Sequence, residues 1–119
     1  MRLCYALDLK DDPVLIAEYE RWHVPGNVPR EIVDSIRTAG IRDMEIFRAG
    51  NRLFMVIEAD EDFSPAAKVA ADATNPRVRA WETLMHQFQQ PLPFAKPGEK
   101  WVAMRRMFSL EEALANRRD

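Results

Sequence analysis

The feature that most constrains the fold of this chain is a pair of apolar segments near its middle, residues 41–47 and 53–59, separated by residues 48–52. Apolar residues alternate imperfectly in the first segment and form an almost continuous run in the second, as strands do. The pattern predicts a β-hairpin whose loop is longer than the tightest two-residue connection. The rest of the chain must then extend or cover one antiparallel sheet.

Helical segments are predicted on both sides of this hairpin. Asp12 and Pro13 form a helix start, with Asp as the N-cap and Pro at the first helical position, and Asn75-Pro76 opens a later helix. Apolar residues recur at helical spacing after both signals. Two further helical stretches are predicted at residues 32–39 and 63–73.

A strand is predicted at each end of this pattern. Residues 3–9 are short, apolar and followed by a Lys-Asp-Asp-Pro break, and residues 101–108 form the last strand after an irregular, Pro-rich loop. The order strand, helix, two strands, helix, strand is the ferredoxin-like βαββαβ plan, which is an α+β fold.

We expect residues 1–119 to form a single domain. Its last element is a short helix at about residues 109–117, because Ser109 with Glu112 makes a capping-box signature. Both helical segments of this plan lie on one face of the sheet, so the other face is bare. A second copy of the sheet would cover it, and we expect a homodimer in the form of a dimeric α/β barrel.

The composition excludes several classes of protein. The 119 residues include 17 basic and 19 acidic ones, and this near balance argues against nucleic-acid binding. No uncharged apolar run approaches the ~20 residues that span a bilayer, and the acid at position 8 comes too early for a signal peptide. The single cysteine, Cys4, cannot build a thiolate zinc site. We expect a cytoplasmic protein with no membrane or nucleic-acid partner.

One of the two histidines, His23, is the candidate for proton transfer. Tyr19 lies four residues earlier, so both side chains occupy one helical face. A phenol beside an imidazole can bind a polar ligand and move a proton. The structural alternative is a partly exposed histidine that the helix dipole stabilises at a C-terminus.

Three tryptophans are present, Trp22, Trp81 and Trp101. Indole faces stack on the apolar faces of sugars and other flat ligands. For any single tryptophan, core packing is the simpler interpretation.

The order and spacing of several short motifs resemble the L-rhamnose mutarotase family, whose members are small enzymes with a dimeric α/β-barrel fold. The resemblance covers residues 2–110, and a proline-rich stretch at residues 89–101 looks like a sub-branch with members in L-fucose pathways. The motifs are Tyr19-Glu20-x-x-His23, Ala39-Gly40-Ile41, Met44-Glu45-Ile46-Phe47-Arg48, Gly50-Asn51-Arg52-Leu53-Phe54-Met55, Asn75-Pro76 and Trp81.

The resemblance implies an isomerase that interconverts the α and β anomers of a 6-deoxy-hexose such as L-rhamnose or L-fucose. Acid/base opening and closure of the ring suffices for this reaction, so the resemblance implies a sugar substrate with no cofactor and no metal. It also implies that His23 transfers the proton, that Tyr19 orients the sugar or His23, and that Trp81 lies against the sugar.

This chain departs from the family pattern beside Trp81, where the family has two adjacent tryptophans and this chain has Ala80. Trp101, Trp22 or Phe108 could supply the second aromatic wall, and we assign Trp101 to sugar binding.

Two other functions fit the same scaffold, because a fold does not determine a function. The first is a non-catalytic module that binds a small ligand. Ala80 favours it, and so does the loop at residues 28–31, where this chain has Val-Pro-Arg-Glu and the family commonly has a Trp-Pro-Glu run. The second is a cofactor-independent monooxygenase, which would need a larger apolar pocket.

Overall fold

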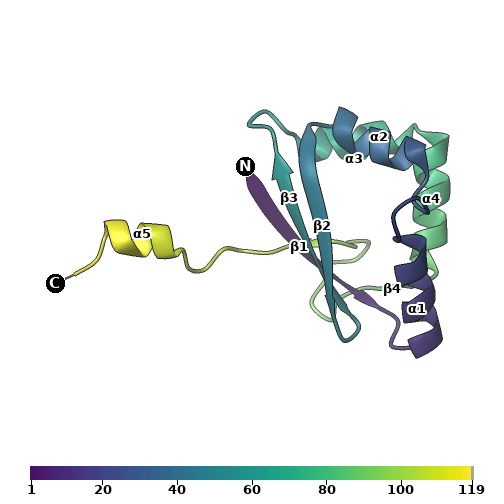
Figure 1. Cartoon of the computed structure of the whole chain (residues 1–119), viewed down its shortest axis with the longest axis horizontal. Coiled ribbons are helices and arrows are strands. Elements are labelled where there is room, and N and C mark those ends of the chain that lie inside the picture. The colour runs from purple at the N-terminus through teal and green to yellow at the C-terminus, as the bar shows by residue number, and fades with distance from the viewer. Residues whose placement is uncertain (119) are drawn as a thin grey trace.

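A computed structural model describes residues 1–118, so Asp119, the last residue of the expected domain, lies outside the described residues. One antiparallel sheet carries helices on one side, and an arm ending in a short helix leaves on the other side (Figure 1). The elements are β1 (Arg2–Leu9), α1 (Pro13–Trp22), α2 (Arg30–Thr38), β2 (Ile41–Ala49), β3 (Arg52–Ala59), α3 (Pro65–Ala73), α4 (Pro76–His86), β4 (Gln89–Gln90), β5 (Val102–Ala103) and α5 (Leu110–Ala115).

The sheet has the strand order β2-β3-β1-β4, and β5 also pairs with β1. All pairings are antiparallel. Two helices connect β1 to β2 and two connect β3 to β4, which correspond to the four helical stretches predicted from the sequence. The predicted α+β, ferredoxin-like arrangement is confirmed.

Local capping explains where the long helices begin. The Asp12 carboxylate accepts hydrogen bonds from the backbone N–H groups of Val14 and Leu15, at 2.9 and 3.1 Å. Asn75 caps α4 in the same way. These side chains satisfy N–H groups that the first turn of a helix leaves free, which is why both starts are readable from the sequence.

The hairpin loop is shorter than predicted. Ala49 pairs with Arg52, so Gly50 and Asn51 alone form the turn, and the prediction of a longer loop was wrong. Gly50 has φ 61, and glycine at the first central position is typical of a type II′ turn. Arg48 looked like a turn residue, but it continues β2 and forms an ion pair with Glu20 at 3.2 Å.

The last strand is also shorter than predicted. Only Val102 and Ala103 pair with β1, and the Met104 N–H still donates to the Cys4 carbonyl at 2.8 Å. Beyond this point the chain leaves the sheet, so the prediction of a strand over residues 101–108 was wrong. An apolar pattern favours extended backbone, but it does not supply a neighbouring strand to pair with.

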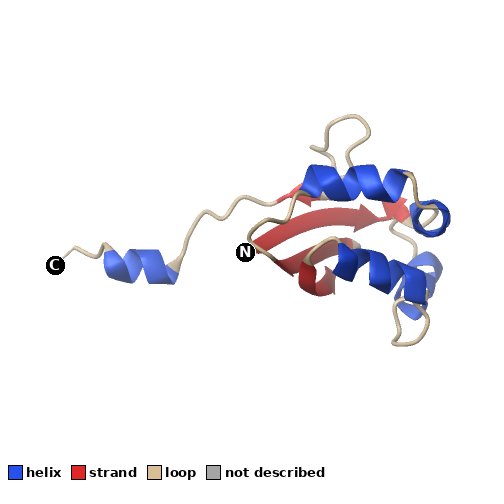
Figure 2. Cartoon of the chain, turned by 90° about the horizontal axis from the view of Figure 1, so that it is seen from above, coloured by secondary structure: helices blue, strands red, loops and turns tan. Residues whose placement is uncertain are grey.

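We call residues 104–118 the C-terminal arm. Figure 2 shows the arm, with α5 near its end, standing clear of the sheet and its helices. The Ser109 hydroxyl accepts from the Glu112 N–H at 3.3 Å and caps α5. The short C-terminal helix that we expected at about residues 109–117 therefore lies at Leu110–Ala115.

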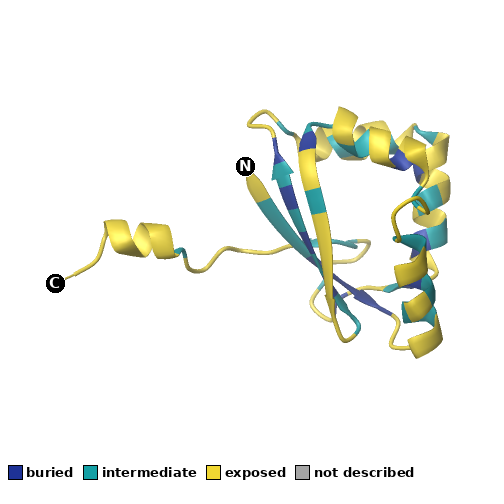
Figure 3. Cartoon of the chain, in the orientation of Figure 1, coloured by how far each residue is buried: buried dark blue, intermediate teal, exposed yellow. Residues whose placement is uncertain are grey.

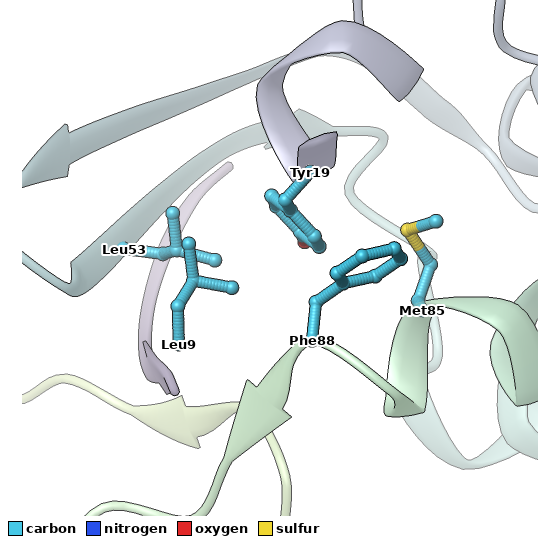
Figure 4. Close-up of a cluster of buried hydrophobic side chains, with 5 residues drawn as sticks. All are labelled: Leu9, Tyr19, Leu53, Met85 and Phe88. Carbon is cyan, nitrogen blue, oxygen red and sulfur yellow. The ribbon is translucent and has the colours of Figure 1, made fainter. Parts of the chain in front are cut away.

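The core lies between the sheet and the helices (Figure 3). Alternate residues of β3 are buried on this side, because successive side chains of a strand point to opposite faces. They join two clusters, one around Tyr19 and one around Ile41. Figure 4 shows the first cluster, which consists of Leu9, Tyr19, Leu53, Met85 and Phe88.

The opposite face of the sheet is not covered by a helix among residues 1–118 (Figure 1). The strand register places several apolar side chains on it, with Phe47 at 53% exposure. They include Cys4, Ala6, Phe47, Phe54 and Val56. We call this surface the bare face.

Two valines test how far the stability depends on the core. Val78 in α4 is 5% exposed, whereas Val69 in α3 is 70% exposed. We expect Val78→Ala to lower the free energy of unfolding by about 2 kcal/mol, because it leaves a cavity. Val69→Ala should raise it by a few tenths of a kcal/mol, roughly the gain in helix propensity. Urea unfolding followed by circular dichroism measures both, and equal effects would contradict the assigned core.

Candidate active site

The candidate site begins at the C-terminal end of α1. Tyr19 and Trp22 lie in the last turns of this helix, and His23 is its C-cap residue. The His23 backbone N–H donates to the Glu20 carbonyl at 3.0 Å, which holds the histidine beside the helix end. A helix C-terminus favours a positive charge, so this position suits an imidazole that gains a proton during a reaction.

The His23 ring is oriented by the backbone of Tyr19. Its Nδ1 lies 2.7 Å from the Tyr19 carbonyl oxygen. A carbonyl oxygen only accepts, so the hydrogen-bonded Nδ1 carries the proton of the neutral ring. Nε2 is then the unprotonated nitrogen, which can act as a base.

Tyr19 packs directly against His23. Their ring centroids are 4.4 Å apart and the ring planes are inclined by 36°. Tyr19 is only 3% exposed, and burial raises the pKa of its hydroxyl, while a hydrogen bond with the Gln89 side chain acts in the opposite direction. Tyr19 therefore remains a neutral phenol that can donate a hydrogen bond near His23.

Trp81 completes this group from α4. Its ring forms a T-shaped contact with the His23 ring at a centroid distance of 5.7 Å and another with the Trp22 ring at 6.1 Å. The structure thus brings together three of the four residues that the sequence analysis assigned to the site, namely Tyr19, His23 and Trp81.

Trp101 is the fourth residue that the sequence analysis assigned to the site. It is partly buried and packs against both hydrophobic clusters, the one that contains Tyr19 and the one that contains Ile41. Of the other candidates for a second aromatic wall, Trp22 contacts Trp81, whereas Phe108 lies on the C-terminal arm and is 67% exposed.

Gln89 is a residue of this site that the sequence analysis did not assign. It stands in β4 directly after Phe88, whose ring meets that of Tyr19 at a centroid distance of 5.9 Å. The sequence signal that could have identified Gln89 is its position directly after Phe88, where a polar residue follows the apolar stripe of the preceding helix.

Two surface hollows lie elsewhere. One of about 590 Å³ lies between α2 and α3, and one of about 270 Å³ lies beside α4 and Lys100. Neither is lined by Tyr19, His23, Trp81 or Trp101. The chemistry of the side chains, and not the depth of a hollow, therefore marks the candidate site.

Two further observations concern residues 1–118. No helix there is both long and apolar enough to cross a membrane. No three histidine, cysteine or acidic side chains in the same range are grouped so that they could hold a metal ion.

A family model described as L-rhamnose mutarotase matches residues 2–110 of this chain. The chain belongs to the L-rhamnose mutarotase family. The prediction of a sugar mutarotase, which is an isomerase, is confirmed by this match and by the relatives described next. The match ends at the first residue of α5, so the rest of that helix lies beyond it.

A curated relative of the family has high sequence identity to this chain. The L-fucose mutarotase of Xanthomonas campestris pv. campestris is 55% identical over 114 residues, which cover 96% of this chain and 91% of that protein.

Two solved structures share the fold. An L-rhamnose mutarotase from Formosa agariphila superposes with a TM-score of 0.67 at 18% identity, covering 92% of this chain and 98% of that one. Tetracenomycin F2 cyclase from Streptomyces glaucescens does so with a TM-score of 0.60 at 14% identity, covering 92% and 97%. At these identities the likeness concerns the fold alone, so the site must be argued from its own residues.

The bond between His23 and the Tyr19 carbonyl makes the ring tautomer measurable. We expect long-range nitrogen–proton NMR spectra of the neutral His23 ring to show the proton on Nδ1. His86 is exposed and provides the matched control, since no such bond to its ring is found in the described residues. A His23 ring with its proton mainly on Nε2 would contradict the assigned geometry.

Proposed function

We propose that this protein interconverts the α and β anomers of L-fucose and that His23 moves the proton. The observation that carries the proposal is the 2.7 Å contact between His23 Nδ1 and the Tyr19 carbonyl, because it leaves Nε2 as a base beside a neutral phenol. The choice of L-fucose over L-rhamnose is supported by the 55% identity to an L-fucose mutarotase.

The reaction requires one proton to move between two oxygens of the sugar. His23 Nε2 takes the proton from the anomeric hydroxyl, and the bond between C1 and the ring oxygen breaks as that oxygen gains a proton from the imidazolium. The open aldehyde turns about its C1–C2 bond. Closure on the other face reverses both proton transfers, so His23 returns to its neutral form.

The surrounding side chains bind the sugar and keep it in place. The Tyr19 hydroxyl donates a hydrogen bond to a sugar oxygen, since burial keeps it protonated. Trp81 and Trp101 offer apolar surface to the sugar ring and its C6 methyl group. Trp22 supports Trp81 by its edge contact. Holding the sugar against the base supplies the orientation that free imidazole in water lacks.

Saturation transfer between the anomeric protons of L-fucose measures the exchange rate directly. We expect the wild-type protein to accelerate exchange and His23→Ala to lower its rate by roughly 100-fold or more, the usual contribution of a positioned acid/base group. His86→Ala is the matched control and should exchange anomers as the wild type does. If His23→Ala retains the wild-type rate, His23 is not the proton-transfer residue.

The substrate is tested in the same assay. L-Rhamnose differs from L-fucose at C2 and C4, so we expect a higher kcat/KM for L-fucose. Equal values would remove L-fucose as the preferred sugar. Saturable sugar binding without faster exchange would instead support the alternative of a non-catalytic binding module.

We further propose that two copies form a homodimer and that the protein acts in the cytoplasm. The bare face is one support for the dimer, because apolar side chains such as Phe47 stand on it without cover. The C-terminal arm is the other support. Met107 is 94% exposed and Phe108 67%, and an arm that presents such side chains to water is stabilised by docking on a second chain.

Size-exclusion chromatography with light scattering tests the homodimer. We expect the wild type to have the mass of two chains, and Met107→Asp with Phe108→Asp to weaken the dimer by placing charges in a buried contact. Val69→Asp is the matched control, since Val69 is 70% exposed on the outer side of α3. A monomeric wild type at micromolar concentration would contradict the homodimer.

A further inference from the structure

The helix α3 leaves an apolar groove beside α2. Both helices pack on α4, and the hollow of about 590 Å³ lies between them. Five of the nine residues of α3 are alanines, yet within residues 1–118 no residue of this helix is buried. Ala67 and Ala71, one turn apart in α3, line the hollow together with Ala39 at the end of α2. Because such small side chains let another helix approach closely, the hollow can take one more helix. We call it the α2–α3 groove.

The rim of the α2–α3 groove is acidic. Four acidic side chains and one lysine line it, namely Glu31, Asp34, Asp62, Asp72 and Lys68. Lys68 forms an ion pair with Asp72 at 2.6 Å, and Asp34 lies 3.9 Å from Arg30. Glu31 and Asp62 form no ion pair within residues 1–118. The groove therefore fits a helix that has apolar side chains on one face and positive charges beside them.

The C-terminal arm has this complementary pattern. Leu110 and Leu114 are exposed, and because they are four residues apart they lie on one face of α5. Arginine pairs flank the helix on both sides, namely Arg105-Arg106 and Arg117-Arg118. The two glutamates of α5 offset only part of this charge, and one of them, Glu112, pairs with Arg106 at 2.7 Å. The arm thus presents two leucines to water between two groups of positive charge.

The length and direction of the arm decide which groove α5 can reach. The arm leaves on the opposite side of the sheet from α2 and α3, so it points away from the groove of its own chain (Figure 1). Residues 105–109 can span at most about 17 Å, and the six residues of α5 add about 9 Å. Two stacked sheets are ~10 Å apart and a helix is ~10 Å in diameter. If a second copy covers the bare face, α5 therefore extends past the sheet of that copy to the level of its helices.

We propose that α5 docks in the α2–α3 groove of a second copy of this chain. Leu110 and Leu114 lie over Ala67 and Ala71, and the flanking arginines face the acidic rim. The proposal rests on the homodimer of the proposed function and adds the place where each arm binds. In a two-fold dimer both arms dock in the same way, so each dimer makes the contact twice.

Disulfide trapping between two different variants tests the contact. One chain carries Ala71→Cys and a mass tag, the other carries Leu114→Cys, and both carry Cys4→Ala to remove the natural thiol. We expect mild oxidation of the mixed dimers to link the two chains, because cysteines whose Cα atoms lie within ~7 Å can form a bridge. Val69→Cys in place of Ala71→Cys is the matched control, since Val69 is exposed on α3 but does not line the groove. It should give at least about tenfold less of the linked pair.

Charge reversal tests the acidic rim. We expect Glu31→Arg with Asp62→Arg to raise the dissociation constant of the dimer about tenfold, and Arg117→Glu with Arg118→Glu to do the same, because like charges then meet. The variant with all four changes should regain part of the affinity, since opposite charges face each other again. Light scattering over a dilution series measures the three constants. Losses that simply add in the fourfold variant would overturn the contact.

The outcomes distinguish this inference from the proposed homodimer. If the wild type is a dimer and Ala71→Cys links no more strongly than Val69→Cys, the homodimer stands and α5 docks elsewhere, for example over the bare face. If the wild type is a monomer, the homodimer is wrong and the docking site falls with it. Anomer exchange by the wild type is measured separately, and neither result changes it.

Discussion

The packing of Tyr19 is the contact on which the rest of the site depends. Its ring lies in a cluster with Leu9 and Leu53 from the sheet and with Phe88 after α4 (Figure 4). The Tyr19 side chain thus packs α1 against the sheet and against the segment that follows α4. Because His23 is one helical turn further on and is tied to the Tyr19 carbonyl, the position of the base follows from this packing.

The same side chain places polar chemistry at the margin of an apolar core. The ring of Tyr19 is buried by leucine and phenylalanine side chains, and the polar ring of His23 packs against it. This arrangement keeps the phenol neutral through desolvation and still provides it with a polar neighbour. A small domain can in this way build an acid/base site from residues that also stabilise it.

Features that depend on local interactions could be predicted from the sequence. The helix starts at Asp12 and Asn75 are satisfied within one turn, and the four-residue spacing places Tyr19 beside His23 in any α-helix. The two-residue turn at Gly50 was missed because the charge of Arg48 suggested a loop, and its pairing with Glu20, 28 residues earlier, is a tertiary contact. The contact between Trp22 and Trp81 was also beyond sequence reasoning, because it joins separate helices.

The sequence by itself determined the order of the elements and the pair of Tyr19 and His23, because capping, periodicity and helical spacing act over a few residues. It also indicated the family, through the resemblance of several motifs in their order along the chain. Only the tertiary structure decided that Trp81 meets His23, that Trp22 meets Trp81, and that the chain leaves the sheet after Met104. Each of these depends on which distant segments become neighbours. The burial of whole helix and sheet faces decides which segments become neighbours, and a local sequence pattern does not show this.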